Sequence, residues 1–397
     1  MSENILVINA GSSSVKYQLL NMDGEKLLAE GEVEKIGEPG SKITHMAGGK
    51  EGVKEIEIRD HFAAFKCILD AFKEFGPDLD KVGIKAIGHR IVQGADLFPG
   101  PVLINEQVLK EIWKLSSLAP IHNGPEARGV EVMHRLLPNI PQVAVFDTSF
   151  FFNLPKEVRT YAIKKEVAEH YRIYRYGAHG ISHEFVGTKV RSMEAERGKD
   201  FRQIVLHLGS GASASAQINE RGTEISMGLT PLEGLVMSTR TGDIDPASIT
   251  YLLKDSPYTL DGIQKLYNEE SGLKGLCGHS DMREVKKLYD AQDPDAVLAV
   301  NVFCHRIVSY IGAYWAQLGS LDALTFTAGI GENVPFIRKL VVDKLSPFGM
   351  KLDDAKNQKG PKDRLISSKD SSVKVLVVHT DEELSIARQT LDLISHM

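Results

Sequence analysis

Two segments of the chain share one pattern, and this repeat restricts the possible folds more than any other feature of the sequence. Aligning "LVINAGSSSVKYQL" (6–19) with "IVLHLGSGASASAQ" (204–217) places Asn9 over His207 and brings the following glycines into register. In each copy an apolar strand enters a Gly/Ser turn, leaves as a second strand and reaches a polar turn. The alternative is chance similarity between two short hairpins, and we favour duplication into two related halves.

Hydrophobic patterning predicts the other elements. Strands are expected at 4–9, 15–21, 27–35, 83–89, 142–146, within 201–227 and at 373–378, with helices at 60–75, 105–117 and across 245–320. "NMDGE", "FPGP" and "NGPE" are expected to be turns, and "ALTFTAGIGEN" (323–333) is expected to be a strand followed by a glycine loop. Thr380 and Glu383 are spaced as a capping box that would open a final helix.

Length and composition indicate an ordinary globular protein of two or three domains. The 397 residues carry a net charge of −6 with basic residues spread along the chain, which argues against binding to nucleic acid or an anionic membrane. Cys67, Cys277 and Cys304 form no CxxC pair, so we expect three buried small residues in a reducing cytosol. No basic region or apolar run precedes the first strand, so no secretory leader is expected. The apolar run at 296–319 contains polar residues, so a buried helix of a soluble protein is predicted there.

The Gly/Ser turns are suited to binding phosphate. Short turns of this kind expose successive backbone N–H groups and hydroxyls, and Lys16 follows the first turn closely enough to reach a phosphoryl oxygen. A solvated lysine on a strand face is the alternative for that residue. No GxxxxGK[ST] string occurs in the chain. "GSGASA" (209–214) matches a dinucleotide-binding fingerprint, but the sequence after it alternates like a strand where that fingerprint needs a helix.

A few charged residues stand in sequence that looks like loops. Arg90 in "GHRIVQG" and Arg240 in "STRTGDIDP" lie near glycines, and arginine binds carboxylates and phosphates in a bidentate manner. Asp147 follows the apolar run "VAVF", a common position for a catalytic or metal-binding carboxylate. His179 and His183 have metal-like spacing, but no third ligand is evident, so a pair on a helix or loop is favoured over a zinc site.

These motifs, taken in order, resemble the acetokinase family of the superfamily that contains acetate and sugar kinases, heat-shock ATPases and actin. The resemblance is nearly full-length and rests on "VINAGSSSVKYQL", "GHRIVQG", "LAPIHN", "VFDTSF", "RYGAHGISH", "HLGSGAS", "SMGLTPLEGL", "TRTGDIDP", "FTAGIGEN" and "EELSIA". It implies an α/β fold of two duplicated ribonuclease-H-like (actin-like ATPase) domains with a nucleotide cleft between them. The implied boundaries are 1–148, completed by a C-terminal helix at 383–397, and 149–382 for the nucleotide-binding domain.

The resemblance also implies roles for individual residues. Catalysis would fall to Arg90, Asp147, His179 and Arg240. The substrate would be bound by Arg90, Val92, Ile121, Ala178 and Pro231. Nucleotide or phosphate would be contacted by Asn9, Ser12, Ser14, Lys16, His207, Leu208, Gly209, Ser210, Gly211, Asp281, Met282, Arg283, Gly329, Ile330, Gly331, Glu332 and Asn333. Asn9 and Glu382 would bind Mg²⁺, for which Mn²⁺ is an alternative.

The implied activity is a reversible phosphotransfer from ATP to a short-chain carboxylate, most simply acetate, in a cytoplasmic homodimer that binds neither nucleic acid nor membrane. Propionate or another short acid is the alternative substrate, because Ala178 stands where the family usually has phenylalanine. The chain also departs from the family pattern at Gln93, Phe151, Ile181, Ser210 and Asp381. Because Ser210 lies in a loop expected to contact the nucleotide, the phosphoryl donor could be ATP or another compound. Two remote alternatives are an NAD-binding oxidoreductase and a non-catalytic actin-like nucleotide switch.

Overall fold

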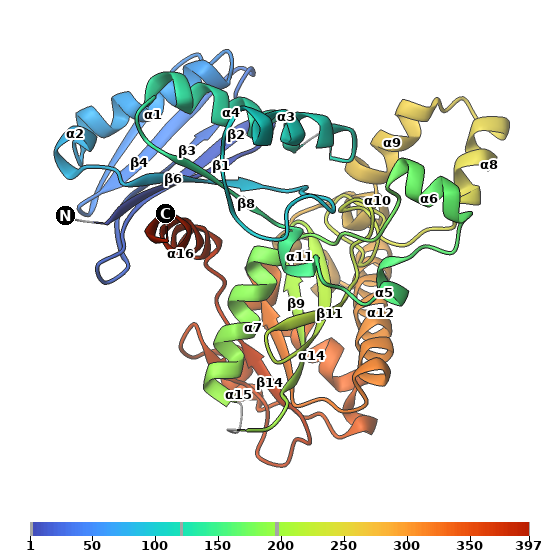
Figure 1. The fold of residues 1–397 in the computed structure, drawn as a ribbon. Coiled ribbons are helices and arrows are strands. Elements are labelled where there is room, and N and C mark those ends of the chain that lie inside the picture. The colour runs from blue at the N-terminus through green and yellow to red at the C-terminus, as the bar shows by residue number, and fades with distance from the viewer. Residues whose placement is uncertain (1–2, 120–121, 195–197, 397) are drawn as a thin grey trace. The chain divides into compact units, whose positions relative to one another are not determined.

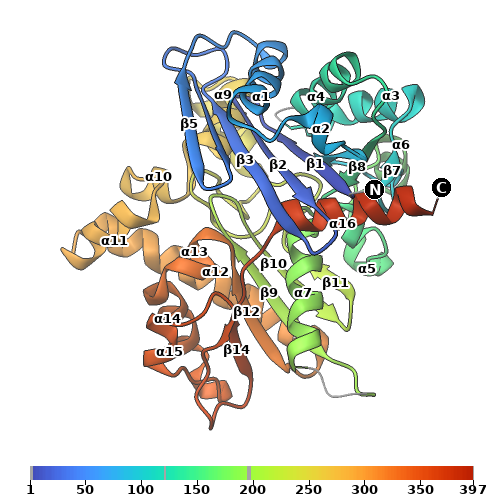
Figure 2. The same cartoon turned by 90° about the vertical axis from the view of Figure 1, so that its left-hand side faces the viewer.

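The computed structural model describes residues 3–119, 122–194 and 198–396. The chain divides into two compact units, one made of Met1–Phe152 with Asp381–Met397 and the other of Asn153–Thr380. Each unit is built on its own mixed β-sheet with helices on both faces (Figures 1 and 2). The last helix therefore belongs to the unit that contains the first strand.

The first unit has an eight-stranded sheet in the order β5-β4-β3-β2-β1-β6-β8-β7. Its elements are β1 (Asn4–Ala10), β2 (Ser14–Asn21), β3 (Lys26–Glu34), β4 (Lys42–Ala47), β5 (Lys50–Glu55), α1 (His61–Phe75), α2 (Leu79–Val82), β6 (Ala86–Ile91), β7 (Val102–Leu103), α3 (Glu106–Lys114), η1 (Leu115–Ser117), α4 (Asn123–Leu136), β8 (Gln142–Phe146), η2 (Ser149–Phe151) and α16 (Glu382–Ser395). Helices α1 and α4 cover one face of this sheet, and α16 crosses the other (Figure 1).

The second unit has a six-stranded sheet in the order β11-β10-β9-β12-β14-β13. Its elements are α5 (Lys156–Arg159), α6 (Lys165–Tyr171), α7 (Gly180–Glu194), β9 (Arg202–Leu208), β10 (Ala212–Ile218), β11 (Arg221–Ile225), α8 (Ala247–Asp255), α9 (Leu260–Glu269), α10 (Gly272–Cys277), α11 (Met282–Asp290), α12 (Pro294–Leu318), β12 (Ala323–Thr327), α13 (Ala328–Asn333), α14 (Pro335–Lys344), η3 (Ser346–Phe348), α15 (Asp354–Gln358), β13 (Arg364–Leu365) and β14 (Lys374–Val377). Helix α7 packs on one face of the sheet and α12 contacts the other (Figure 2).

The two sheets confirm the internal repeat. The order β3-β2-β1-β6-β8-β7 in the first unit corresponds strand for strand to β11-β10-β9-β12-β14-β13 in the second, with the same parallel and antiparallel neighbours. Asn9 pairs with Lys16 across the first hairpin, and His207 pairs with Ser213 across the second. Lys16 and Ser213 are therefore equivalent positions, and the first turn is one residue longer.

Helix α16 approaches its sheet closely because β6 carries a glycine beneath it. A Cβ on Gly88 would overlap the side chains of Thr390 and Ile386 on α16. Arg90 lies two residues further along β6, and alternation along a strand places it on the same face. The close packing of α16 thus places the start of this helix next to the Arg90 side chain.

Most predicted elements are present, and four local predictions are wrong. The segment "NGPE" is the first turn of α4, and "GIGEN" belongs to α13. Asp381, and not Thr380, caps α16: its carboxylate accepts a hydrogen bond from Leu384 N, while the Thr380 hydroxyl bonds Ser182. Among the cysteines only Cys304 is buried, because Cys67 and Cys277 lie on half-exposed helix faces.

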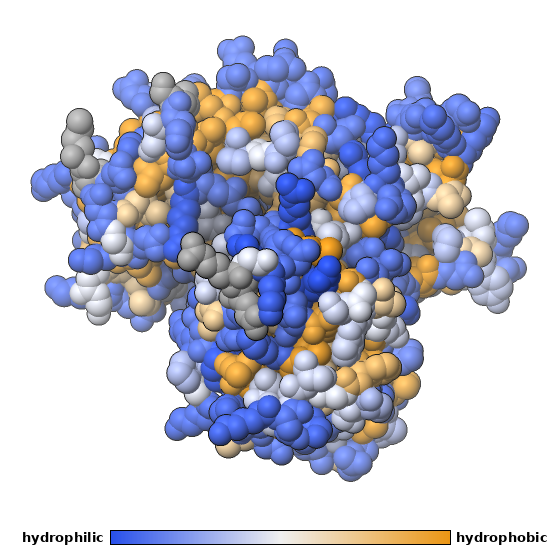
Figure 3. Space-filling view, turned by 60° about the horizontal axis from the view of Figure 1, so that its bottom comes forward, coloured by the Kyte–Doolittle hydropathy of each residue, from blue (hydrophilic) through white to orange (hydrophobic). Residues whose placement is uncertain are grey.

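Helix α12 is the one described helix that is long and apolar enough to cross a membrane by length and composition, which is weak evidence by itself. Its buried side chains include Val300, Phe303 and Ile307, and it packs against α10, α11 and α14. On the face shown in Figure 3, hydrophilic residues surround smaller hydrophobic patches. Helix α12 is therefore explained as a core helix of the second unit.

Candidate active site

Three polar residues of the first unit converge at the carboxyl ends of parallel strands. Arg90 lies near the end of β6, Asp147 directly follows β8, and Asn9 is the penultimate residue of β1. Strands β1, β6 and β8 are parallel neighbours, so their carboxyl ends meet at one edge of the sheet. Glu382, the first residue of α16, lies at the same edge.

The guanidinium of Arg90 connects this cluster. Its Nη2 donates to Asp147 Oδ2 at 2.6 Å, and its Nη1 lies 3.4 Å from Asn9 Oδ1. Its Nε lies 3.5 Å from Glu382 Oε2. Burial disfavours the charged form of Arg90, but the charges of Asp147 and Glu382 outweigh it and raise its pKa. Burial raises the pKa of Glu382 to about 7. Arg90 is therefore a fixed cation held by carboxylates.

Glu126 is a buried member of this cluster that sequence reasoning missed. It lies in the first turn of α4 and is 3% exposed, and its Oε2 accepts a hydrogen bond from Val92 N at 2.9 Å. Burial raises its pKa to about 8. Nearby, Asn123 and Gln93 exchange two hydrogen bonds, Gln93 N to Asn123 Oδ1 and Asn123 Nδ2 to Gln93 O. The proline and glutamate of "NGPE", read as a helix start, would have indicated this turn.

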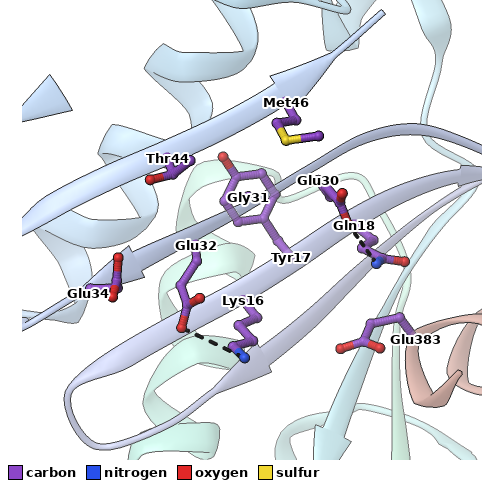
Figure 4. Close-up of a pocket in the computed structure, with 10 residues that line it drawn as sticks. All are labelled: Lys16, Tyr17, Gln18, Glu30, Gly31, Glu32, Glu34, Thr44, Met46 and Glu383. Atoms are coloured by element: carbon purple, nitrogen blue, oxygen red, sulfur yellow. Dashed lines mark hydrogen bonds and ion pairs between the residues drawn. The ribbon is translucent and has the colours of Figure 1, made fainter. Parts of the chain in front are cut away.

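The Gly/Ser turn of the first unit is closed by a hydrogen bond from Gly11 N to Ser14 O at 2.7 Å. Ser12 is exposed at its tip and Ser14 begins β2. Lys16 shares a sheet face with Asn9, but its ammonium lies 3.9 Å from Glu32 Oε1. It lines a hollow of about 410 Å³ with Gln18, Glu30, Glu34 and Glu383, which Figure 4 shows. The prediction that Lys16 contacts phosphate is not tested by this arrangement.

Histidines and serines cluster on one sheet face of the second unit. His179 precedes α7 in a left-handed conformation with φ of 57°, and its ring stacks on His207 with the centroids 4.2 Å apart. His207 Nδ1 lies 2.8 Å from Ser182 Oγ. His183 lies on α7, one helical turn after His179, and is fully buried. No group able to hold a metal ion by three or more His, Cys, Asp or Glu side chains occurs among the described residues.

The second Gly/Ser turn lies against His179 and Arg240. Gly209 N donates to Gly211 O at 2.9 Å, and Ser210 O accepts from Ser238 N. A Cβ built on Gly211 would lie 3.1 Å from His179 Nε2 and 3.8 Å from Arg240 Nη1. A glycine at 211 therefore leaves room beside the His179 ring and the Arg240 guanidinium. Arg240 also donates to the carbonyl of Pro231, which is predicted to bind the substrate. The structure therefore brings these two predicted site residues together.

Half-buried polar side chains hold the loop that carries Arg240. Arg175 donates to Glu233 and to the carbonyls of Ile225, Ser226 and Met227, and Tyr161 donates to Glu233. The carboxylate of Asp243 accepts from Gly234 N at 2.8 Å and from the Tyr310 hydroxyl at 2.9 Å. Sequence reasoning missed these supports, because their partners lie far apart along the chain.

The remaining predicted nucleotide segments lie at two helix starts. Asp281 caps α11 and forms an ion pair with Arg283, and Asp281 is half-exposed whereas Arg283 is exposed. Residues Gly329–Asn333 lie in α13, where Glu332 accepts from Ala328 N and lies 2.7 Å from His379 Nδ1. The ring of Phe336 at the start of α14 lies 5.6 Å from that of Tyr289 on α11, so the two segments are neighbours.

The predicted acyl-pocket residues fall in different places. Val92 follows β6 and Ala178 precedes His179, and both are buried. Ile181, one of the departures from the family pattern, is buried on α7. Phe151, another of these departures, is buried in the first unit. Ile121 lies outside the described residues.

Comparison with known proteins decides the family. Residues 4–388 match the Acetokinase family. The chain belongs to this family. It is 48% identical to an acetate kinase of Clavibacter michiganensis subsp. michiganensis over 388 residues, which cover 98% of both chains. It is also 47% identical to an acetate kinase of Streptomyces coelicolor over 99% of this chain and 98% of the relative.

Solved structures of acetokinase-family enzymes have the same fold. A propionate kinase from Francisella tularensis subsp. tularensis SCHU S4 superposes with a TM-score of 0.93 at 39% identity, over 98% of both chains. Acetate kinase from Porphyromonas gingivalis gives a TM-score of 0.91 at 38% identity, over 99% of this chain and all of that one. The duplicated actin-like fold expected from the sequence is thereby confirmed.

The acetokinase family consists of phosphotransferases with a carboxyl group as acceptor, so the assignment as an enzyme is confirmed. The dinucleotide-binding alternative is wrong, because "GSGASA" runs directly into strand β10 and no helix follows the glycines. A non-catalytic switch does not fit a chain that matches acetate kinases along almost its whole length.

Proposed function

We propose that the chain catalyses the reversible transfer of the terminal phosphoryl group of ATP to acetate, forming ADP and acetyl phosphate by direct in-line displacement. The observation that carries this proposal is the match to acetate kinases over 98% of both chains at 48% identity. The first-unit cluster around Arg90 and the second-unit cluster around His179 and Arg240 would supply the chemistry that such a transfer needs.

The reaction brings two anions together, and fixed cations offset their repulsion. Phosphoryl transfer needs little covalent participation by the protein and much charge neutralisation. Arg90, held by Asp147, would neutralise the carboxylate, and Arg240 would stabilise the transition state. His179 would donate a hydrogen bond to a phosphoryl oxygen, and the Gly/Ser turns at 11–14 and 209–211 would bind phosphates through backbone N–H groups.

The residues around Arg90 fit a magnesium ion. Asn9 Oδ1 and Glu382 Oε2 both lie within 3.5 Å of the same guanidinium, and such hard oxygen donors suit Mg²⁺ or Mn²⁺. Magnesium is commonly bound by one or two carboxylates together with substrate phosphates, which agrees with the small number of ligands here. Glu382 and Asn9 would hold the ion, which would neutralise phosphate charge.

Propionate is a second candidate substrate. The solved propionate kinase shares the fold at 39% identity, and the small side chain of Ala178 is buried beside His179. An acyl pocket that lacks an aromatic ring would accept one more methylene group. This would change the discrimination between acetate and propionate by about 1–3 kcal/mol.

A coupled assay of acyl phosphate formation with formate, acetate, propionate and butyrate tests the function. We expect turnover with ATP and Mg²⁺, highest with acetate or propionate, and a parallel run with pyrophosphate tests the donor. Folded protein that forms no acyl phosphate from any of the four acids would refute the proposal.

A homodimer, a cytoplasmic location and the domain boundaries 1–148 with 383–397 and 149–382 remain predictions, which light scattering, cell fractionation and limited proteolysis would check.

A further inference from the structure

The residues of helix α7 and strand β10 that face each other are spaced alike along the two elements. Ser213, Ser215 and Gln217 alternate on one face of β10, whereas His179, His183 and Gly187 recur every four residues. Two residues of a strand span about 6.7 Å and four residues of a helix about 6 Å, so the two series stay in step. A Cβ on Gly187 would overlap the Gln217 amide, so the glycine permits this close packing.

The matched side chains form a continuous hydrogen-bonded chain. Gln217 Nε2 lies 3.1 Å from Ser215 Oγ, which lies 2.8 Å from His183 Nδ1. On the other edge of that ring, His183 Nε2 lies 2.7 Å from Ser213 Oγ. Ser213 Oγ in turn lies 2.9 Å from His179 Nδ1. Ser213, Ser215 and His183 are fully buried, so each proton in the chain needs a protein acceptor.

Two backbone carbonyls determine which groups donate and which accept along this series of hydrogen bonds. The carbonyl of His183 can only accept, so the Gln217 group 3.0 Å from it is the amide NH₂. The Gln217 oxygen then faces Gln203 Nε2, whose own orientation is set by a 2.8 Å bond to the carbonyl of Gly187. Gln217 therefore donates to Ser215, and the Ser215 hydroxyl has its own proton left to donate.

The proton of Ser215 has one acceptor among its described neighbours, His183 Nδ1. Burial and the nearby His207 lower the pKa of His183 well below 6.5, so its ring is neutral and carries its single proton on Nε2. That proton goes to Ser213 Oγ, and the Ser213 hydroxyl proton goes to His179 Nδ1. The reverse direction would leave the buried Ser215 hydroxyl accepting two hydrogen bonds and donating none.

We propose that Ser213 and His183 are positioning residues that hold neutral His179 in the tautomer with its proton on Nε2. In this tautomer His179 is a hydrogen-bond donor without carrying a charge, and its Nε2 faces the space left by Gly211, close to Arg240 Nη1. The donor would thus be directed toward a bound phosphoryl oxygen before substrate arrives. That catalytic consequence rests on the proposed function, whereas the tautomer does not.

Nitrogen-15 NMR of the full chain with labelled histidine tests the tautomer directly. Long-range nitrogen–proton correlations distinguish Nε2–H from Nδ1–H imidazole, and a His179→Gln variant identifies the His179 signals among the 13 histidines. We expect neutral His179 to be protonated on Nε2 in the unaltered protein. Protonation on Nδ1 would overturn the proposal, and this measurement requires neither a turnover assay nor a successful serine variant.

Removal of the Ser213 hydroxyl tests the role of the hydrogen-bonded side chains. In Ser213→Ala we expect a mixture of His179 tautomers and a fall in kcat of about tenfold or more, with KM for the carboxylate little changed. Ser213→Thr, which keeps the hydroxyl, should restore the single tautomer. Thr325→Val removes a buried hydroxyl that has no partner among the described residues and should leave His179 unchanged. An unaltered tautomer in folded Ser213→Ala would also overturn the proposal, even if the enzyme proved inactive on every acid.

Discussion

Arg90 and Asp147 form an enclosed ion pair, with Nη2 and Oδ2 2.6 Å apart and only 18% and 1% of the two side chains exposed. Removing one partner of such a pair leaves the other charge buried and uncompensated. The pair therefore links the stability of the first unit to the position of the cation that we propose binds the substrate.

Replacement of Arg90 should affect both activity and stability. In Arg90→Ala we expect a loss of about 2–4 kcal/mol in transition-state stabilisation and about 3–5 kcal/mol in the free energy of unfolding. Steady-state kinetics and urea unfolding measure the two effects. The double variant Arg90→Met/Asp147→Leu should recover stability but not activity, and Arg59→Ala, at an exposed ion pair, is the control. Normal turnover in folded Arg90→Ala would exclude the carboxylate-binding role.

Replacement of Arg240 should separate activity from stability more clearly. Its guanidinium donates to the backbone carbonyl of Pro231, which is neutral, so the loss of this contact in Arg240→Ala does not leave a buried charge uncompensated there. We expect a loss of about 2–4 kcal/mol in transition-state stabilisation with a smaller change in unfolding free energy than in Arg90→Ala. Arg240→Lys keeps the charge but not the bidentate geometry, and should recover only part of the rate.

Glu126 should make the protein less stable as the pH rises. Burial raises its pKa from the ordinary 4.5 to about 8, so between these values the folded state retains a proton that the unfolded state has lost. The free energy of unfolding therefore falls as pH increases through this window, by more than about 1 kcal/mol. Glu126→Gln keeps an acceptor for Val92 N and should flatten the dependence between pH 5 and 8. An identical slope in the variant, measured by urea unfolding, would assign the effect to other groups.

The Tyr310–Asp243 hydrogen bond should position Arg240 through its loop. Tyr310→Phe removes a bond of 2.9 Å to a carboxylate that also accepts from Gly234 N. We expect about 1.5–3 kcal/mol lower stability and a lower kcat/KM for the carboxylate. Tyr258→Phe, at an exposed tyrosine, is the matched control. If kcat/KM is unchanged while stability falls, the bond supports the fold without orienting Arg240.

Ala178 should influence acyl-chain length. Because a phenylalanine here would fill space that one more methylene needs, Ala178→Phe should lower kcat/KM for propionate much more than for acetate, by about 1–3 kcal/mol in discrimination. Ala178→Val should give a smaller effect in the same direction. Equal responses for the two acids, or strong rejection of propionate by the unaltered protein, would show that another residue determines chain length.

The sequence alone predicted the duplicated strands and the charged residues at the ends of two of the strands. Apolar alternation and the two Gly/Ser turns predicted the first three strands of each unit, because such signals depend on neighbours along the chain. The position of Asp147 after a buried strand and of Arg90 near glycines singled out both residues for the same reason.

Tertiary structure decided how these side chains are oriented and supported. Glu233 and Ser213 gave no signal of their own, and "NGPE" could at most have indicated the helix start at Glu126, since a glutamate or serine is ordinary in a helix or strand until its partner is known. Helix α16 is capped by Asp381 because Thr380 is bonded to Ser182, a residue 198 positions earlier in the chain. Hydrogen bonds between distant segments have no periodicity in the sequence, so the direction of the Ser213–His179 bond emerges only when α7 lies on β10.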